Sequence, residues 1–178
     1  MFIKDRQMAV TLEEMVRRIE TMSLVHQMLY KTSNLSRVDL KEYVASLAEL
    51  IARSYNELSR KVKLKLELES IKVLFDTAIP CGLIINEILT NSYKYAFPDS
   101  AAGEIVIRLS QTDNGMISLE LSDNGIGLTH DSYVSDTLGM KLIRGIAEDQ
   151  LKGTLTLIQQ KGVCYNLCFK DELYNERI

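Results

Sequence analysis

The order of strand-like and helical segments constrains the fold of this chain more than any other feature. Residues 63–69 read Lys-Leu-Lys-Leu-Glu-Leu-Glu, a strict alternation that is typical of a half-exposed β-strand. Asp113-Asn114-Gly115 is a hairpin signal, and Lys161-Gly162 provides a final turn. Further strands are predicted at about 71–75, 104–111, 116–122, 154–159 and 163–169.

Helical patterns alternate with these strands. Asp39 is a plausible N-cap, with Glu42 completing a capping box. Pro80 is expected to open a second helix because its fixed φ suits a first turn, and Pro98 closes it. The mixture predicts an α/β sandwich, a mixed sheet covered by helices on one face. The helices are predicted at about 40–58, 80–96 and 138–150.

A long helix is predicted to precede this sandwich. Its apolar positions are spaced by fours and threes, which is the heptad seam of a helix that packs against partner helices. One helix cannot bury its own seam, so we expect a homodimer through residues 8–30. A polar break at 32–39 predicts two units, a dimerisation-type helix over 1–34 and a globular domain over 35–178. The seam consists of Met8, Leu12, Met15, Ile19, Met22, His26 and Leu29.

Composition narrows the function and the location. A net charge of −3 argues against a sequence-independent nucleic-acid binder, which normally has a basic surface. No apolar run approaches the ~18–20 residues needed to span a bilayer, so no membrane contact is expected within this chain. Cys81, Cys164 and Cys168 form no CxxC pair. Free thiols fit a reducing compartment, and we predict a cytoplasmic protein.

The helix predicted over 80–96 carries the first candidate site. Helical spacing places Glu87, Asn91, Lys94 and Tyr95 on one side, opposite an apolar face. A magnesium-bound triphosphate needs such a row: an oxygen ligand for the ion, a cation for the phosphates and a carboxylate that orients a nucleophile. On its own, the row is more often a solvated helix face.

Two glycine-bearing segments supply further candidates. The turn Asp123-Asn-Gly-Ile-Gly127 follows a predicted strand, and its carboxylate could accept a hydrogen bond from an exocyclic amine. Gly139 lies at the start of the last helix, where unpaired N–H groups favour phosphate. A plain turn and an ordinary helix entry are the more common interpretations of each segment taken singly.

The order and spacing of these segments resemble the sensor histidine kinases. Residues 86–95 (Asn-Glu-Ile-Leu-Thr-Asn-Ser-Tyr-Lys-Tyr) look like their N-box, and 123–127 like their G1 box. Leu138-Gly139-Met140 looks like the G2 box, and Gly153-Thr154 like the Gly-Thr element that follows it. The resemblance implies the Bergerat nucleotide fold, which these kinases share with gyrase, heat-shock chaperone and mismatch-repair ATPases.

The resemblance extends upstream. Residues 18–30 (Arg-Ile-Glu-Thr-Met-Ser-Leu-Val-His-Gln-Met-Leu-Tyr) and 38–43 are similar to the branch whose phosphoacceptor box reads His-Arg-Val-Lys-Asn. In that branch this segment is the second helix of the dimerisation hairpin. His26 and His130 are the chain's histidines, and neither lies in such a box. We interpret His26 as a packed bundle histidine and His130 as an exposed one, so the accepting helix is expected to be absent.

The resemblance also assigns roles, with ATP and Mg²⁺ as cofactors. Asn91 would ligate Mg²⁺, Glu87 would polarise the attacking group, and Lys94 would contact phosphate. Gly139 frames the lid, expected over 129–137, and offers backbone to phosphate; Ser135-Asp-Thr-Leu-Gly139 has fewer glycines than many kinases show. Tyr95 and Leu138, next to Lys94 and Gly139 in these motifs, are also expected to bind the cofactor.

At the other end of the implied pocket, Asp123 would accept from the adenine amino group. Thr154 would support adenine, and Gly125 and Gly127 would shape the pocket. The leading hypothesis is therefore the ATP-binding catalytic portion of a sensor histidine kinase, which transfers the γ-phosphoryl group to a histidine for relay to a response regulator. The alternatives are a nucleotide-gated, non-catalytic regulatory module and an anti-sigma-type serine kinase.

Overall fold

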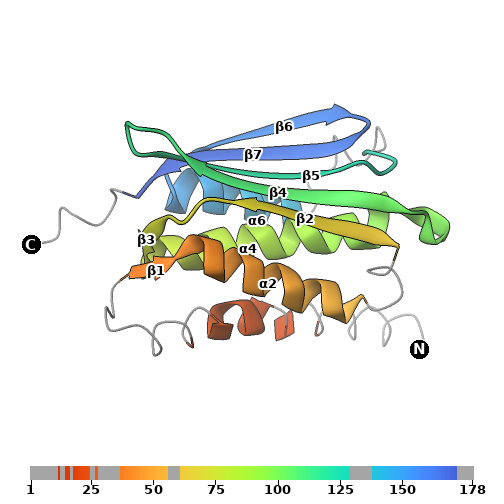
Figure 1. Cartoon of the computed structure of the whole chain (residues 1–178), viewed down its shortest axis with the longest axis horizontal. Helices are drawn as coiled ribbons and strands as arrows, with labels where there is room; N and C mark the ends of the chain where they lie inside the picture. Colours follow the sequence, from red (N-terminus) through yellow and green to blue (C-terminus); the bar gives the residue numbers. More distant parts are fainter. Residues whose placement is uncertain are drawn as a thin grey trace, which may run out of the picture.

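The computed structural model describes residues 12, 15, 16, 18–24, 27, 37–55, 61–128 and 138–171. In this part of the chain, five strands form a mixed sheet in the order β2-β4-β5-β7-β6 (Figure 1). Helices α2, α4 and α6 cover one face of the sheet (Figure 1), so the predicted α/β sandwich is confirmed. The strands are β2 Val62–Leu68, β4 Gly103–Gln111, β5 Met116–Asp123, β6 Thr154–Gln160 and β7 Gly162–Lys170.

The sheet combines parallel and antiparallel pairing. Strands β2 and β4 are parallel, because α4 Phe75–Asn91 crosses over between them. The other neighbours are antiparallel. The predicted turns join β4 to β5 and β6 to β7. Gly115 (φ 80°) and Gly162 (φ 91°) both adopt the left-handed conformation that favours glycine. A Cβ on Gly162 would lie 1.9 Å from the Asp123 carbonyl oxygen, so the final turn packs directly against the end of β5.

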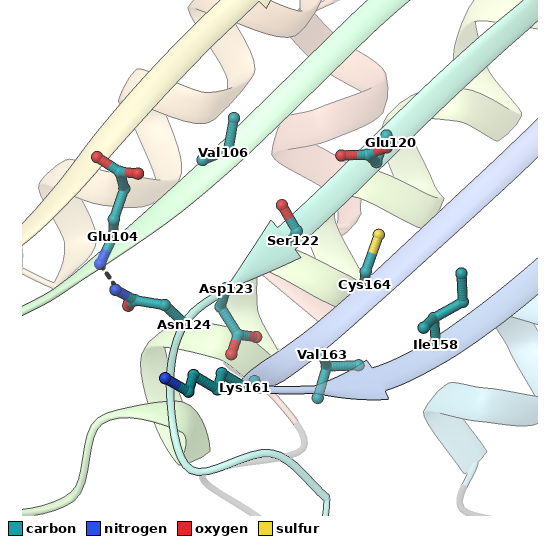
Figure 2. A pocket seen from close by; sticks show the side chains of 11 residues that line it. Glu104, Val106, Glu120, Ser122, Asp123, Asn124, Ile158, Lys161, Val163 and Cys164 are labelled. Carbon is teal, nitrogen blue, oxygen red and sulfur yellow. Dashed lines mark hydrogen bonds between the residues drawn. The ribbon is translucent and has the colours of Figure 1, made fainter.

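Among the described residues, no helix covers the outer face of the sheet (Figure 1). This face carries charged and small polar side chains. Arg108 on β4 pairs with Glu67 on β2 at 2.6 Å and also with Glu120 on β5. A shallow hollow of about 380 Å³ lies beside these residues (Figure 2). Its lining includes Glu104, Ser122 and Cys164.

An N-terminal helix forms an additional layer beneath α2 and α4 (Figure 1). Thr21 is buried, and its carbonyl accepts a hydrogen bond from the Tyr43 hydroxyl at 3.1 Å. Leu24 packs against the core. The opposite face is exposed, and it includes the described members of the predicted seam; Met8, His26 and Leu29 lie outside the described residues. The exposed apolar residues are Leu12, Met15, Val16, Ile19 and Met22.

Helix α2 Leu40–Ser54 begins where the sequence predicts. The Asp39 side chain accepts from the Lys41 N–H at 2.9 Å, which confirms the N-cap, and Glu42 lies in the first turn. Residues 56–58 of the predicted helix lie outside the described residues. The apolar face of α2 packs into the core through Leu40, Tyr43, Val44, Leu47, Ala48 and Ile51.

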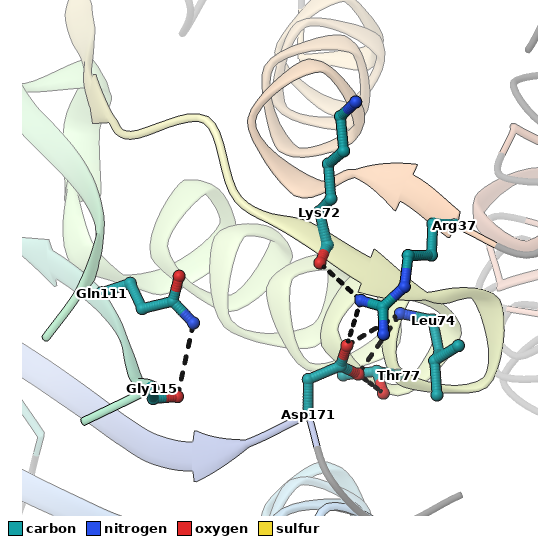
Figure 3. A network of polar contacts seen from close by, with 7 residues as sticks. All are labelled: Arg37, Lys72, Leu74, Thr77, Gln111, Gly115 and Asp171. Carbon is teal, nitrogen blue, oxygen red and sulfur yellow. Dashed lines mark hydrogen bonds and ion pairs between the residues drawn. The ribbon is translucent and has the colours of Figure 1, made fainter. Parts of the chain in front are cut away.

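The prediction that Pro80 opens a helix is wrong. Helix α4 begins at Phe75, so Pro80 lies within it, and the strand predicted over 71–75 is shortened to β3 Lys72–Leu74. Strand β3 pairs antiparallel with β1 Arg37–Asp39, outside the main sheet. The early start has a tertiary cause, because the carboxylate that caps α4 comes from Asp171, just beyond the end of β7 (Figure 3).

Asp171 accepts hydrogen bonds from three of the described residues. It accepts from the N–H of Leu74, the N-cap residue of α4, at 3.1 Å and from the hydroxyl of Thr77, in the first turn of α4, at 2.5 Å. Arg37 on β1 pairs with it at 3.1 Å and also donates to the Lys72 carbonyl (Figure 3). This network ties the start of α4 to the end of the sheet.

We expect Asp171→Ala to lower the free energy of unfolding by about 2–3 kcal/mol, because it removes a helix cap and leaves half-buried donors without an acceptor. Urea denaturation measures this loss. The matched control is Asp113→Ala, since Asp113 is an exposed carboxylate in the β4–β5 turn. A midpoint equal to that of the control would show that the network contributes no stability.

Candidate functional site

The predicted polar row lies at the end of α4. Glu87 and Asn91 are partly buried there, whereas the opposite face of the helix is buried against the sheet as predicted, through Ile85 and Ile88. After Asn91 the helix continues as a π-helix, η1 Ser92–Ala96. Wider turns of this kind occur often at functional sites, because they change the direction of the following side chains. Lys94 is half-buried in η1, and Tyr95 is exposed.

Helix α6 Leu138–Gly145 brings Gly139 beside this row. A Cβ on Gly139 would lie 3.4 Å from Glu87 Oε2 and 3.9 Å from Asn91 Nδ2. The start of α6 therefore faces a carboxylate and a carboxamide without a side chain in between. Backbone N–H groups at a helix start favour phosphate. The structure brings the N-box row and the G2 glycine together, as the motif order implies.

Asp123 occupies the last position of β5, and its carboxylate is held rigidly. The Ser92 hydroxyl donates to Oδ2 at 2.9 Å, and the Gly125 N–H donates to Oδ1 at 3.0 Å. The side chain is buried, with 9% exposure. Each carboxylate oxygen has two lone pairs, so both can accept a further hydrogen bond. The geometry suits an acceptor that must recognise one amino group in a fixed place.

The glycine turn after Asp123 packs closely against η1. A Cβ on Gly125 would lie 2.3 Å from the Ala96 carbonyl oxygen, which also accepts from the Ile126 N–H at 2.9 Å. Gly127 has a φ of 77°. The Gln159 side chain of β6 donates to the Leu128 carbonyl at 2.8 Å. Both glycines are thus required by the backbone, the first for close approach and the second for its conformation.

Not every predicted residue joins this cluster. Thr154 pairs with Cys168 and is exposed on the sheet face opposite to the helices, whereas Asp123 faces the helices. The structure therefore does not bring Thr154 to Asp123. Leu138 begins α6, but its side chain is not among the described parts of the structure. The expected lid over 129–137, which includes His130, also lies outside the described residues.

Val163 lies beside Asp123, although the sequence motifs did not predict it as a site residue. Ser122 pairs with Cys164, so the next residues along these antiparallel strands, Asp123 and Val163, are also neighbours. Val163 is buried and directly follows the positive-φ Gly162. A sequence signal for Val163 exists. Gly162-Val163, like Gly153-Thr154 one strand earlier, is a glycine followed by a β-branched residue.

The donor set fits a magnesium ion that is held mainly by a nucleotide. Within the described residues, no group of three or more His, Cys, Asp or Glu side chains converges on a metal position. Mg²⁺ commonly takes one or two protein ligands and completes its shell with phosphate oxygens and water. Asn91, partly buried beside Gly139, is placed to serve as such a ligand.

The outer hollow of Figure 2 is a different feature. It touches Asp123 from the far side of the sheet, and its lining contains neither Glu87 nor Asn91. Strand β5 separates the two places, because Glu120 and Ser122 face outward while Leu121 and Asp123 are buried. We therefore assign the candidate site to the helix side of the sheet, where the polar groups of α4, α6 and the glycine turn meet.

A mixed sheet covered on one face by helices, with a helical polar row and a buried carboxylate after a glycine turn, defines a nucleotide-binding ATPase of the Bergerat type. Residues 77–173 match the family of histidine kinase-, DNA gyrase B- and HSP90-like ATPases, and residues 2–55 match a family described as histidine kinase. The chain belongs to this ATPase family and is the ATP-binding catalytic portion of a sensor histidine kinase. These matches do not favour either alternative function.

Individual relatives agree with this assignment. The chain is 24% identical to blue-light-activated histidine kinase 2 of Erythrobacter litoralis, over 76% of this chain and 40% of that protein. It is 28% identical to the nitrate/nitrite sensor protein NarQ of Escherichia coli, over 66% of this chain and 20% of that protein. It therefore spans less than half the length of either relative. No described helix has the length and hydrophobicity required to cross a membrane.

A solved structure confirms the fold. The histidine kinase domain of an Erythrobacter litoralis blue-light-activated histidine kinase superposes with a TM-score of 0.80 at 22% identity. The similarity covers 89% of this chain and 75% of that domain. The histidine kinase AdeS of Acinetobacter baumannii gives a TM-score of 0.64 at 20% identity, over 96% of this chain and 83% of that one.

Tyr165 on β7 makes the stability of the fold depend on pH in the alkaline range. Burial, and secondarily the charge of Asp123, raise the pKa of Tyr165 from 10.0 to about 12. The folded protein therefore holds the phenol proton more tightly than the unfolded chain does. The resulting stability is fully present below pH 10 and is lost as the pH rises toward 12.

We expect this group to remove about 2–3 kcal/mol of unfolding free energy between pH 10 and 12, since each pKa unit corresponds to about 1.36 kcal/mol. Denaturant titrations across this range should show a shallower decline for Tyr165→Phe than for the wild type. Tyr95→Phe is the control, because Tyr95 is exposed. If the unfolding free energy declined equally in the wild type and both variants, the titration of Tyr165 would not contribute to stability.

Proposed function

We propose that the complete protein transfers the γ-phosphoryl group of Mg·ATP to a histidine and relays it to an aspartate of a response regulator. The single observation that carries this proposal is the convergence of Glu87, Asn91 and Gly139 at one end of a site whose other end is the rigidly held Asp123. One end offers ligands for a metal-chelated phosphate, and the other offers an acceptor for an amino group.

In this proposal each residue has one task. Asp123 accepts from the adenine amino group, and the buried Val163 packs beside the base. Asn91 holds Mg²⁺, which would neutralise phosphate charge, and Lys94 contacts a phosphate oxygen. Phosphoryl transfer depends mainly on such positioning and charge stabilisation. Gly125, Gly127 and Gly139 allow the backbone to approach the nucleotide closely.

Glu87 acts on the accepting histidine. A neutral imidazole attacks with one nitrogen, and the bond between the γ-phosphorus and the bridging oxygen breaks as ADP leaves. The other ring nitrogen carries a proton, and the Glu87 carboxylate accepts a hydrogen bond from that N–H. This interaction raises the nucleophilicity of the attacking nitrogen and stabilises the imidazolium that forms.

The wider organisation is also a proposal. Residues 1–34 would form a dimerisation-type helix and 35–178 the ATPase domain, in a cytoplasmic kinase. The exposed apolar face from Leu12 to Met22 supports a homodimer, because an apolar surface of this kind favours association.

Asp123→Asn tests the adenine end of the site. A hydrogen bond to a charged group contributes about 1.5–3 kcal/mol, so ATP affinity should fall about tenfold or more. Calorimetric titration with ATP and magnesium measures the change. Asp113→Asn, in the exposed β4–β5 turn, is the control. Unchanged affinity in a folded Asp123→Asn protein would remove the adenine assignment.

Glu87→Gln tests the catalytic end in a longer kinase that contains this chain and its phosphoacceptor. We expect acid-labile phosphate on histidine to form about 10²-fold more slowly, the usual scale of general acid–base catalysis, with little loss of ATP affinity. Glu49→Gln is the control, since Glu49 is an exposed carboxylate on α2. Transfer at the wild-type rate would show that Glu87 has no role in the chemistry.

A further inference from the structure

An ion pair connects the N-terminal helix to the candidate site. The Arg18 side chain donates through Nε to Glu87 Oε1 at 2.8 Å. The two side chains are only 26% and 13% exposed. A charge-assisted hydrogen bond shielded in this way is stronger and more specific in geometry than an ion pair in open solvent.

The two carboxylate oxygens of Glu87 have different neighbours. Oε1 accepts from Arg18, while Oε2 faces the position that a Cβ on Gly139 would occupy, 3.4 Å away. Asn91 Nδ2 lies 3.9 Å from that same position. The bond to Arg18 therefore fixes the side-chain rotamer that turns the second oxygen toward the nucleotide end of the site.

The helix that carries Arg18 has two faces with different tasks. Thr21 and Leu24 hold the inner face on the ATPase domain, through the Tyr43 hydroxyl and the core. Leu12, Met15 and Ile19 expose apolar side chains on the outer face. Any protein surface that binds the outer face acts directly on the helix that bears the guanidinium.

We propose that Arg18 is a positioning residue for Glu87, and that its ion pair couples the seating of the N-terminal helix to the geometry of the catalytic carboxylate. This inference rests on the proposed role of Glu87 in phosphoryl transfer. With the helix seated on α4, the carboxylate is held in one orientation. When the helix moves away, Glu87 loses that restraint and rotates among its rotamers.

Arginine is suited to this task. Its planar guanidinium makes hydrogen bonds of fixed direction, whereas a lysine ammonium supplies a point charge on a flexible chain. Arg18→Gln removes the charge and keeps much of the length. Arg18→Lys keeps the charge and is expected to restore only part of the orienting effect.

A double-mutant cycle read by NMR tests the coupling in the ¹⁵N-labelled chain without nucleotide. Arg18→Gln should shift the Gly139 amide and the Asn91 side-chain amide signals. In a Glu87→Gln background the same substitution should leave both signals in place, because the carboxylate that transmits the effect is gone. Arg53→Gln is the control, since Arg53 pairs with Glu49 on the exposed side of α2.

The cycle separates positioning from loss of the helix. If Arg18→Gln merely detached the helix, the two signals would shift equally in both backgrounds, and that result would overturn the proposal. Equal effects of Arg18→Gln and the Arg53→Gln control would overturn it as well. Arg18→Lys should give an intermediate shift.

A rate measurement in the longer kinase gives a second readout. Arg18→Gln should lower kcat for histidine phosphorylation while KM for Mg·ATP stays constant, and Arg18→Lys should recover part of kcat. A faster reaction would show that the pair restrains the kinase, against the proposal. If the wild-type chain binds no Mg·ATP, the proposed function fails, whereas the NMR cycle still decides whether Arg18 orients Glu87.

Discussion

The hydrogen bond from Ser92 to the buried Asp123 joins the two halves of the site, and the remaining geometry depends on it. Ser92 begins the π-helix that follows α4, and Asp123 ends β5. A buried carboxylate requires such partners, because its desolvation is otherwise costly. The close approach of Gly125 to the Ala96 carbonyl fixes the same junction from the backbone. The distance between the amino-group acceptor and the phosphate end is therefore set by the protein rather than by the ligand.

Two other long-range contacts place α4 relative to this junction. Asp171 holds the first turn of the helix through the Leu74 N–H and the Thr77 hydroxyl. Near the other end, Arg18 holds Glu87. Both contacts use a charged side chain from a distant part of the sequence, and both are partly shielded from solvent. Helix α4 is thus the element on which the sheet, α6 and the N-terminal helix converge.

The arrangement divides the molecule into a rigid part and an adjustable part. The sheet and α4 share one buried core, so their relative positions change little without loss of packing. The glycine turn is attached to this core through the Ala96 carbonyl. In the part of the chain that the structure describes, the N-terminal helix contacts the rest of the protein through Thr21, Leu24 and Arg18. A partner that binds the exposed apolar face of this helix can therefore affect the site directly, through the bond from Arg18 to Glu87.

Local patterns in the sequence determined the strands, the Asp39 cap, the hairpin turns and the identity of the polar row, because alternation, capping and turn chemistry act between near neighbours. They also placed Glu87, Asn91, Asp123 and Gly139 in one predicted site, through motif order. Only the tertiary structure decided where α4 begins, since its cap, Asp171, is 97 residues away from Leu74. It also decided that Thr154 faces away from Asp123 and that Arg18 reaches Glu87. Strand register and contacts between distant segments arise from tertiary packing, so local sequence patterns do not predict them.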